Sequence, residues 1–411
     1  MKRCFNFTMA AVLAAAMLAT GCGGNGSGTT DVTASGQEQQ GTQGTAQAEG
    51  QQETGQVTGQ QGTVRDDVIV VMGPTSEPEA GFDPAYGWGA GEHVHEPLIQ
   101  STLTVTTTDL KIGYDLATGM EASDDGLTWT VTIRDDVSFT DGEKLTAGDV
   151  AFTYNTLRDT SSVNDFTMLK EAQAVNDTTV EFHMNRPYSI WPYTMAIVGI
   201  VPEHAYGAGY GEHPVGSGRY MLKQWDKGQQ VILEANPDYY GEAPIMKKVT
   251  ILFMEEDAAY AAVMSGQADL AYTAASYSDQ TLPGYELLAF ETVDNRGFNL
   301  PAVPDEGKTE DGISIGNDFT SDVQVRRAIN LAIDRNEMID NVLSGYGSPA
   351  YSVCDKMPWY NDAAQVGYDA VKAADILDKA GWVIGGDGIR EKDGVRASMT
   401  LMYPASDSVR Q

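Results

Sequence analysis

Residues 123–150 read SDDGLTWTVTIRDDVSFTDGEKLTAGDV and contain a strand signal followed directly by a helix signal. Trp129, Val131 and Ile133 alternate with threonines, which is the pattern of a half-exposed antiparallel strand. Thr146 followed three residues later by Asp149 is typical of a helix start, and the helix is expected to continue over 150–157. One short stretch therefore indicates a fold that contains both strands and helices.

The same succession of strand and helix signals extends over the chain from about residue 68. Runs of β-branched and apolar residues predict strands over 68–72, 180–184 and 249–253. A hairpin is expected with strands at 220–225 and 229–235. A helix is expected over 257–264, and a last short strand is expected to end at Leu401. Mixed sheets that carry helices and are divided between two lobes are the natural reading of this pattern. The sequence therefore predicts an α/β fold.

The region 320–345 carries the clearest helical pattern. Ser321 and Gln324 have capping-box spacing, and a stripe of apolar residues follows at helical periodicity. The stripe consists of Val325, Ala328, Ile329, Ala332 and Ile333. Asp334 interrupts it, a second helix carries Met338, Ile339 and Val342, and Gly345 supplies a stop signal. A further helix is predicted over 371–380, ended by Gly381.

The N-terminus has the features of an export signal. Lys2 and Arg3 precede an apolar stretch over 5–19 that is too short to span a bilayer comfortably, and small residues lead to Cys22. Residues 1–22 resemble the signal peptide of a bacterial lipoprotein, which implies that Cys22 is lipidated, although Ala19 stands where leucine is usual. A plain secretory signal cut nearby is the alternative.

Residues 23–65 consist almost wholly of Gly, Gln, Thr, Ser, Ala and Glu, without an aromatic residue. Such a segment has little apolar surface to bury and is expected to stay disordered. Its position directly after Cys22 predicts a tether between a membrane anchor and a folded part.

Composition excludes several functional classes. The chain has 58 acidic and 26 basic residues and a formal net charge of −32, which argues against binding of DNA or RNA. The three cysteines are Cys4, Cys22 and Cys354, so no disulfide is expected once the signal is removed and Cys22 is lipidated. No nucleophile–base pair, phosphate-binding loop or zinc-site spacing is present, so neither an enzyme nor a cofactor is predicted.

Four stretches together resemble one family. Residues 123–150 are similar to its most diagnostic block, a tryptophan strand followed by a DG turn and a helix. The other three stretches are 214–244, with a glycine turn and an NPDYYG loop in which Arg219 replaces the usual proline; 325–350, a helix pair; and 373–382, the helix after it. The chain is thereby identified as a member of the family 5 extracellular solute-binding proteins of bacterial ABC transporters, which bind oligopeptides, dipeptides or nickel. IREKDG at 389–394 resembles the nickel-binding branch in particular.

The resemblance implies the two-lobed clamshell of the type II periplasmic binding proteins. The first lobe would cover 66–300 with an inserted subdomain over about 109–200, and 301–411 would form part of the second lobe. Relatives continue well beyond the position of Gln411, so the second lobe is expected to be incomplete at its C-terminus.

The function implied is capture of oligopeptides or related small polar solutes outside the membrane. The receptor would be anchored to the cell membrane by its lipid and would deliver solute to ABC permease subunits served by a separate ATPase. A receptor for nickel or another metal chelate is the alternative within the family. A lipoprotein that senses peptides without importing them is an alternative of a different class.

The candidate ligand-binding residues come from three places. The stretch 82–100, FDPAYGWGAGEHVHEPLIQ, corresponds to a segment that lines the cleft in relatives, and its glycines would let Tyr86 and Trp88 face outward. His93 and His95 lie in the same stretch and are also candidate metal ligands, although on a helix only one of them would face the cleft. Tyr272 and the pair Phe298 and Asn299 match positions that line the cleft or pair with an extended peptide in relatives. Ordinary packing in the core and hinge is the alternative interpretation of these residues. Residues 197–202 lack the arginine with which nickel-binding relatives clasp a chelator.

Overall fold

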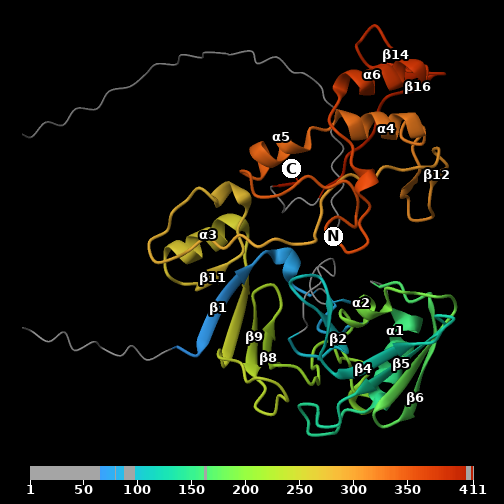
Figure 1. Ribbon diagram of the computed structural model, residues 1–411. Helices are drawn as coiled ribbons and strands as arrows, with labels where there is room; N and C mark the ends of the chain where they lie inside the picture. Colours follow the sequence, from blue (N-terminus) through green and yellow to red (C-terminus); the bar gives the residue numbers. More distant parts are fainter. Residues whose placement is uncertain (1–64, 79, 88–97, 162–163, 404–408, 411) are drawn as a thin grey trace, which may run out of the picture. The chain divides into compact units, whose positions relative to one another are not determined.

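The computed structural model describes residues 65–403 and 409–410, except for 79, 88–97 and 162–163 (Figure 1). The predictions for Cys22, Trp88, His93 and His95 concern positions outside these residues. So do the predicted signal peptide and all but the last residue of the predicted tether.

The first sheet has five strands in the order β11-β1-β10-β9-β8 (Figure 1). They are β1 Asp67–Met72, β8 Tyr220–Asp226, β9 Gln230–Ala235, β10 Lys248–Phe253 and β11 Leu270–Ala271. β1 runs parallel to both β10 and β11, whereas β9 pairs antiparallel with β10 and with β8. The strands expected at 68–72, 220–225, 229–235 and 249–253 are confirmed, and Gly228 adopts a φ of +76° in the turn between β8 and β9.

Apolar residues cover both faces of this sheet. On one face Phe82, Ile99, Leu233 and Ile251 form a buried cluster. On the other face Val71 packs with the alanines of helix α3 (Glu256–Met264), which confirms the helix expected at 257–264. Two short 3₁₀ turns, Pro74–Ser76 and Ala275–Tyr277, lie in the segments that follow β1 and β11.

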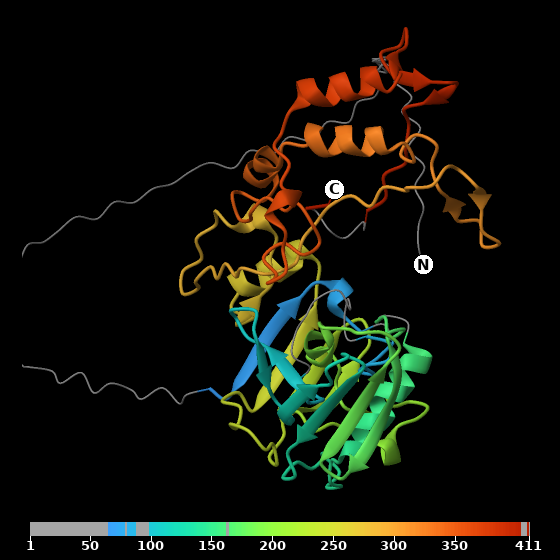
Figure 2. The same ribbon diagram turned by 45° about the vertical axis from the view of Figure 1, so that its right-hand side comes forward.

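The second sheet has four strands in the order β4-β5-β7-β6, all antiparallel, with α1 against one face (Figure 2). The strands are β4 Ala117–Ala122, β5 Thr128–Ile133, β6 Leu169–Asn176 and β7 Thr179–Met184. In β5 the predicted alternation is confirmed, since Val131 and Ile133 are buried. Helix α2 (Trp191–Met195) and the small β2–β3 pair (Thr104–Thr106, Ile112–Tyr114) belong to the same region, and a 3₁₀ turn (Glu203–Ala205) follows.

Helix α1 (Ala147–Thr160) begins where the sequence predicts. The Thr146 side chain accepts a hydrogen bond from the Gly148 N–H at 3.2 Å, and the Asp149 carboxylate accepts one from the Thr146 N–H at 2.9 Å. The helix then presents Val150, Tyr154 and Leu157 to the largest hydrophobic cluster among the described residues. A capped start and one apolar face explain why this segment is helical.

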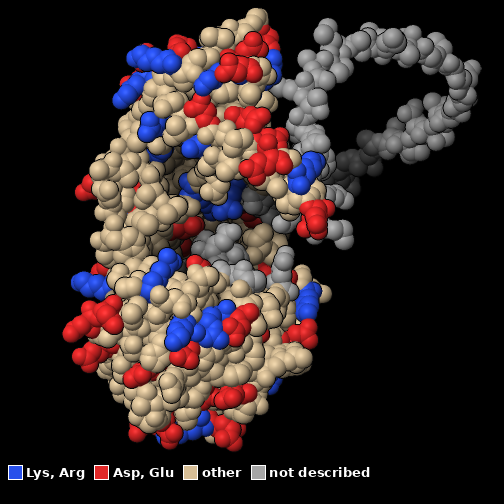
Figure 3. Space-filling model, turned by 90° about the vertical axis from the view of Figure 1, so that its right-hand side faces the viewer, with Lys and Arg blue, Asp and Glu red and all other residues tan. Residues whose placement is uncertain are grey.

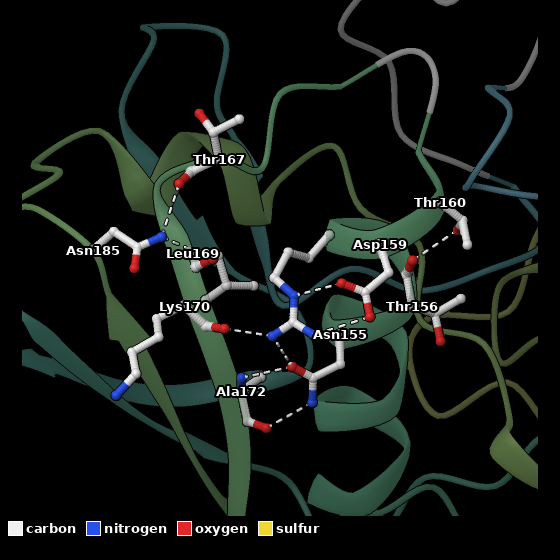
Figure 4. A network of polar contacts seen from close by, with 10 residues as sticks. Asn155, Thr156, Asp159, Thr160, Thr167, Leu169, Lys170, Ala172 and Asn185 are labelled. Atoms are coloured by element: carbon white, nitrogen blue, oxygen red, sulfur yellow. Dashed lines mark hydrogen bonds and ion pairs between the residues drawn. The ribbon is translucent and has the colours of Figure 1, made fainter.

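Asn155 of α1 fastens the helix to the outermost strand of the second sheet (Figure 4). Its side-chain amide donates to the Ala172 carbonyl of β6 at 2.8 Å, and its carbonyl oxygen accepts from the Ala172 N–H at 3.0 Å. Arg158 of the same helix donates to the Lys170 carbonyl of β6 and pairs with Asp159. These side chains satisfy backbone groups that an edge strand otherwise leaves unpaired.

The described residues beyond 300 form smaller elements. Helices α4 (Val323–Ala332) and α6 (Ala370–Lys379) pack against each other, and α5 (Arg335–Val342) lies between them in sequence. Two small antiparallel sheets consist of β12–β13 (Gly307–Lys308, Ser314–Ile315) and β14–β15–β16 (Val383–Ile384, Arg390–Lys392, Val395–Arg396). A 3₁₀ turn covers Asp362–Ala364.

Two details in this region correct the expectations. The cap of α4 is Asp322, whose carboxylate accepts from the Gln324 N–H at 2.8 Å, whereas the Ser321 hydroxyl donates to the Asp318 carbonyl. Asp322 also accepts from the Trp382 indole at 3.1 Å and from Lys392 at 3.0 Å, so these contacts fix it at the helix start. The strand predicted to end at Leu401 is wrong, because no described strand pairs with residues 397–403.

The predicted apolar stripe of α4 is buried in part. Val325 and Ala328 are buried, whereas Ala332 is exposed. Asp334 caps α5 by accepting from the Asn336 and Glu337 N–H groups, which confirms the break between the two helices. Gly345 and Gly381 end α5 and α6 with φ values of +82° and +87°, as predicted.

Among the residues that the structure describes, no helix has the length and apolar character that crossing a membrane requires.

Candidate functional site

The carboxyl ends of three strands meet at one edge of the five-stranded sheet, because β1, β10 and β11 run parallel. We call this edge, with the three segments that leave it (73–87, 254–264 and 272–278), the carboxyl edge. In open sheets that contain parallel strands, ligands bind outside the carboxyl ends of those strands. The carboxyl edge is therefore the candidate site in the described part of the chain.

Tyr272 follows β11 directly and belongs to the carboxyl edge. Its backbone N–H donates to the Val71 carbonyl at 2.9 Å, which continues the pairing of β11 with β1 and fixes the backbone of Tyr272. Its side chain is 63% exposed. A fixed backbone with an exposed aromatic ring is well suited to contact a ligand at low entropic cost.

Tyr86 lies in the segment that follows β1, before Gly87, and its side chain is 49% exposed. Gly87 has a φ of +87°, a backbone conformation that favours glycine. The structure therefore brings two of the predicted residues, Tyr86 and Tyr272, into segments that leave the same sheet edge.

Asp83 holds the segment that carries Tyr86 in place. Its carboxylate is buried, accepts from the Ala85 N–H at 2.9 Å and accepts from the Tyr206 hydroxyl at 3.0 Å. Burial raises the pKa of Asp83 above its ordinary value. Gln100 supports the same segment by donating to the Phe82 carbonyl at 2.9 Å. No role was predicted for Asp83 from the sequence, because its partner Tyr206 lies far from it along the chain.

A second anchor lies nearer to β1. The Glu77 carboxylate accepts from the Trp225 indole at 2.9 Å and from the Gly228 N–H at 2.7 Å, which joins the segment after β1 to the β8–β9 hairpin. Gly81 has a φ of +86°, and a Cβ atom there would lie 2.5 Å from the Gly211 carbonyl oxygen. Only glycine allows this close approach of the two backbones.

Tyr260 and Tyr277 form an aromatic pair at the carboxyl edge that the sequence analysis missed. Their rings are stacked with centroids 4.5 Å apart and an interplanar angle of 21°. The Tyr277 hydroxyl donates to the Asp257 carboxylate at the start of α3. The two tyrosines come from segments that follow different strands, so only the fold brings them together.

Phe298 and Asn299 lie apart from any helix or strand and are exposed. Neither forms a ring contact or a side-chain hydrogen bond with another described residue. Their assignment to the site stays a prediction, as do those of Tyr86 and Tyr272. Trp88, His93 and His95 belong to the segment outside the described residues.

The exposed aromatic side chains of the carboxyl edge are suited to noncovalent contact with a ligand. No group of three or more His, Cys, Asp or Glu side chains is placed to hold a metal ion in the part of the chain that the structure describes. Figure 3 shows Lys and Arg side chains interspersed with Asp and Glu on one face, rather than a surface of a single charge. Exposed tyrosines on fixed backbones at the carboxyl edge can contact a solute without bond formation.

The comparisons with known proteins agree on one family. The family model for "Bacterial extracellular solute-binding proteins, family 5 Middle" matches residues 111–411. Protein XP55 of Streptomyces lividans is 36% identical over 83% of this chain and 62% of its own length. The oligopeptide-binding protein AppA of Bacillus subtilis is 29% identical over 83% of this chain and 65% of its own length. The chain thus spans less than two thirds of the length of these two relatives.

Solved structures show the same similarity. NikZ from Campylobacter jejuni, in complex with Ni(L-His), matches with a TM-score of 0.66 and 26% identity, over 81% of this chain and 66% of that one. AppA from Bacillus subtilis, in complex with a nonapeptide, matches with a TM-score of 0.61 and 26% identity, over 81% of this chain and 68% of that one. The mixed α/β fold of the binding proteins is therefore confirmed over about four fifths of the chain.

The family model covers most of the chain, and the fold and the resemblance of the sequence motifs agree with it. The family is one of binding proteins, in keeping with the expectation that the chain is not an enzyme. This chain belongs to the bacterial extracellular solute-binding proteins of family 5.

Proposed function

We propose that this chain is the solute-binding component of an ABC importer and captures oligopeptides or related small polar solutes outside the membrane. The observation that carries the proposal is the family match over residues 111–411. The solved AppA structure that resembles this chain holds a nonapeptide, which supports a peptide as the solute. The exposed tyrosines at the carboxyl edge supply the kind of surface that such a ligand requires.

The proposed mechanism is closure on the ligand. Residues 66–300, with an inserted subdomain over about 109–200, act as the first lobe, and the second lobe begins near residue 301. A solute that contacts both lobes stabilises the closed state and shifts the population toward it. The closed receptor then docks on permease subunits, and a separate ATPase drives transport.

The predicted ligand-binding residues have two different roles in recognition. Tyr86, Trp88 and Tyr272 provide aromatic contact area for the ligand. Phe298 and Asn299 contact an extended peptide, and the Asn299 side-chain amide forms hydrogen bonds with the peptide backbone. Trp88→Ala in the full-length protein is expected to weaken binding of a defined oligopeptide by about 1–3 kcal/mol, the usual cost of losing an aromatic anchor. Calorimetry checks this, and an unchanged affinity with an unchanged melting temperature removes Trp88 from the site.

A nickel chelate is the second candidate solute. The similarity to NikZ in complex with Ni(L-His) favours it, and His93 and His95 are the candidate ligands. The stretch 197–202 offers no arginine for a chelator, and Val198, Ile200 and Val201 within it are buried. The similarity to NikZ therefore supports a nickel chelate as the solute, whereas the residues at 197–202 do not.

One binding screen separates these candidates. The full-length protein is titrated with a library of defined oligopeptides and, separately, with nickel–histidine, with the melting temperature as readout. A rise with peptides and none with nickel–histidine is expected, because a ligand that binds only the folded state stabilises it. A rise with nickel–histidine alone assigns the protein to chelates, and no rise with either contradicts the proposal.

The proposed location is the outer face of the cell membrane, with Cys22 as the lipidated residue and 23–65 as the tether. Cys22→Ala is expected to release the protein into the soluble fraction, as cell fractionation would reveal. A variant that stays as membrane-bound as the wild type contradicts the anchor. Neighbouring genes for permease and ATPase subunits separate import from sensing of peptides without import.

A further inference from the structure

Helix α1, which packs against β6 of the four-stranded sheet, fixes the backbone that leads to Tyr206. The Val201 N–H donates to the Thr153 hydroxyl at 3.1 Å, and that hydroxyl donates to the Asp149 carbonyl at 2.7 Å. The Glu203 N–H donates to the Asp149 carboxylate at 3.1 Å. Because Thr153 and Asp149 are both buried, these bonds fasten the segment before Tyr206 to the helix.

Tyr206 reaches from α1 to the segment that follows β1. Its ring packs edge to face on Phe152 of α1, with centroids 5.5 Å apart and an interplanar angle of 72°. Its hydroxyl donates to the carboxylate of Asp83, and the hydroxyl oxygen lies 3.0 and 3.2 Å from the two carboxylate oxygens. One side chain therefore connects the helix of the second sheet with a segment of the carboxyl edge.

Asp83 extends this support to Tyr86. The Asp83 carboxylate accepts from the Ala85 N–H at 2.9 Å, and the Asp83 carbonyl accepts from the Tyr86 N–H at 3.0 Å. Ala85 is 1% exposed, whereas Tyr86 next to it is 49% exposed. Because a buried carboxylate is costly unless its hydrogen bonds are made, Asp83 keeps these partners. The ring of Tyr86 is thus presented from a backbone that Tyr206 helps to fix.

A separate set of contacts holds the start of the same segment. The Gln100 side chain donates to the Phe82 carbonyl at 2.9 Å, and the Phe82 N–H donates to the Gly211 carbonyl at 2.8 Å. These bonds act on Phe82, whereas the Tyr206 hydroxyl acts one residue later, on Asp83. Loss of the Tyr206 hydroxyl is therefore expected to loosen residues 83–87 without releasing Phe82.

We propose that Tyr206 is a positioning residue for solute binding: its hydroxyl, through Asp83, holds Tyr86 in the orientation in which the ring contacts the solute. This inference rests on the proposed function, which places Tyr86 among the ligand-binding residues. Tyr206 acts through Tyr86 and does not itself touch the solute. An aromatic side chain that is fixed before binding loses less entropy when the ligand arrives, so loss of the hydroxyl weakens binding.

A double-mutant cycle in the full-length protein tests this route. Tyr206→Phe keeps the ring and removes only the hydroxyl. By calorimetry it is expected to weaken binding of the oligopeptide that stabilises the wild type most by at least about threefold. In the Tyr86→Ala background the same change is expected to have no effect, because the residue that Tyr206 positions is gone. Equal losses in both backgrounds, or no loss with Tyr86 present, overturn the proposal.

Tyr220→Phe is the matched control, because it removes the same atom from another tyrosine. The Tyr220 hydroxyl donates to the Met246 carbonyl at 3.0 Å, in the segment that precedes β10, at the end of that strand opposite to the carboxyl edge. Its removal is expected to leave the affinity unchanged. A loss as large as that of Tyr206→Phe shows that the effect is not specific to Tyr206 and contradicts the assignment.

Hydrogen exchange of the solute-free protein separates this inference from the proposed function. In Tyr206→Phe the amides of 83–87 are expected to exchange faster, while those of β5 and α1 keep their wild-type rates. Unchanged exchange at 83–87, or faster exchange in all of these elements, overturns the positioning role. If no oligopeptide binds to the wild type, the proposed function fails, and the exchange result alone decides whether Tyr206 holds the segment.

Discussion

Gly216 lets two backbone segments approach more closely than any residue with a Cβ atom allows. A Cβ atom at this position would lie 2.0 Å from the carbonyl oxygen of Ile99. We expect Gly216→Ala to destabilise the protein by about 1–3 kcal/mol or more, because backbone has to move to relieve the overlap. Urea unfolding measures this change.

Gly119 provides the matched control for that substitution. A Cβ atom at Gly119 in β4 meets no heavy atom within 4 Å, and its φ is not in the left-handed region. Gly119→Ala is therefore expected to be neutral or to stabilise by up to about 1 kcal/mol, since alanine loses less backbone entropy on folding. Equal costs for the two substitutions would contradict the close approach of Gly216 to Ile99.

His204 makes the stability of the second sheet's region depend on pH. Its Nε2 lies 2.7 Å from an Asp141 oxygen, and that hydrogen bond raises the pKa of His204 above its ordinary value of 6.5. Glu143 and Asp149 act in the same direction. A group whose pKa is raised by folding contributes fully below its unfolded pKa, and the contribution is lost as the pH rises through the folded pKa.

Asp141→Asn tests this sign, because asparagine keeps the shape of the side chain and removes its charge. We expect the melting temperature to fall more at about pH 5.5, where His204 is protonated, than at about pH 8.5. His183→Gln gives a control histidine outside the Asp141 pair. An Asp141→Asn effect that is the same at both pH values shows that the charge pair contributes nothing.

At the scale of elements, the Asn155 side chain of α1 connects this helix to β6 through two hydrogen bonds. Asn155→Ala leaves the N–H and the carbonyl of Ala172 without their partners. Loss of a partner for buried backbone groups costs about 1–3 kcal/mol, so the free energy of unfolding should fall by that amount. Asp159→Ala on the same helix is the control, because its ion pair with Arg158 is exposed and contributes less than about 1 kcal/mol.

The contrast between β5 and β6 shows what the sequence can predict about an element. β5 alternates Trp129, Val131 and Ile133 with threonines, so its periodicity alone reveals a strand. β6 reads LKEAQAVN and has no such alternation. It becomes a strand because it pairs with β7 on one side and with Asn155 on the other, and such tertiary contacts are invisible in a single sequence.

The error at Leu401 has the opposite cause. Residues 397–401 alternate apolar and polar side chains, which satisfies the local preference for a strand. A strand also needs a partner, and none of the described strands pairs with these residues. Likewise, capping-box spacing favoured Ser321 as the cap of α4, while contacts with Trp382 and Lys392 select Asp322 instead. Local patterns identify the helix, and distant partners decide its first residue.

The family resemblance suggested Tyr86 and Tyr272 as ligand-binding residues, because they match positions that line the cleft in relatives. The structure places them in segments that follow β1 and β11, and their contact with a ligand stays a prediction. Asp83 and the stacked pair of Tyr260 and Tyr277 were missed. Their roles depend on segments that meet only in the folded chain, and no spacing in the sequence encodes that meeting.

At the scale of the whole molecule, burial is distributed unevenly along the described residues. Between 65 and 300, three clusters of buried apolar residues support the two sheets. Between 301 and 403, the buried apolar side chains are Val325, Ala328, Ala373 and Trp382, while Val353, Val371 and Met402 are each more than 80% exposed. Regions with few buried contacts open more readily than well-packed ones.

Limited proteolysis of the 411-residue chain should therefore cut first between about 301 and 403 and leave a resistant fragment from about 65 to 300. The N-terminal sequence and mass of the fragments identify the cut sites. Cleavage that begins within β1, β9 or α1 would contradict the account. Equal resistance of both regions would do so as well.

The central claim is that a solute binds at the carboxyl edge. Its most direct test is calorimetry of the full-length protein with the oligopeptide that stabilises it most, comparing Tyr272→Ala with Tyr114→Ala. Both tyrosines are exposed, but Tyr114 belongs to β3 and to none of the segments that form the carboxyl edge. We predict that Tyr272→Ala weakens binding by about 1–3 kcal/mol, roughly 5- to 150-fold, while Tyr114→Ala leaves the affinity unchanged. Wild-type affinity in Tyr272→Ala, or an equal loss in both variants, would contradict the claim.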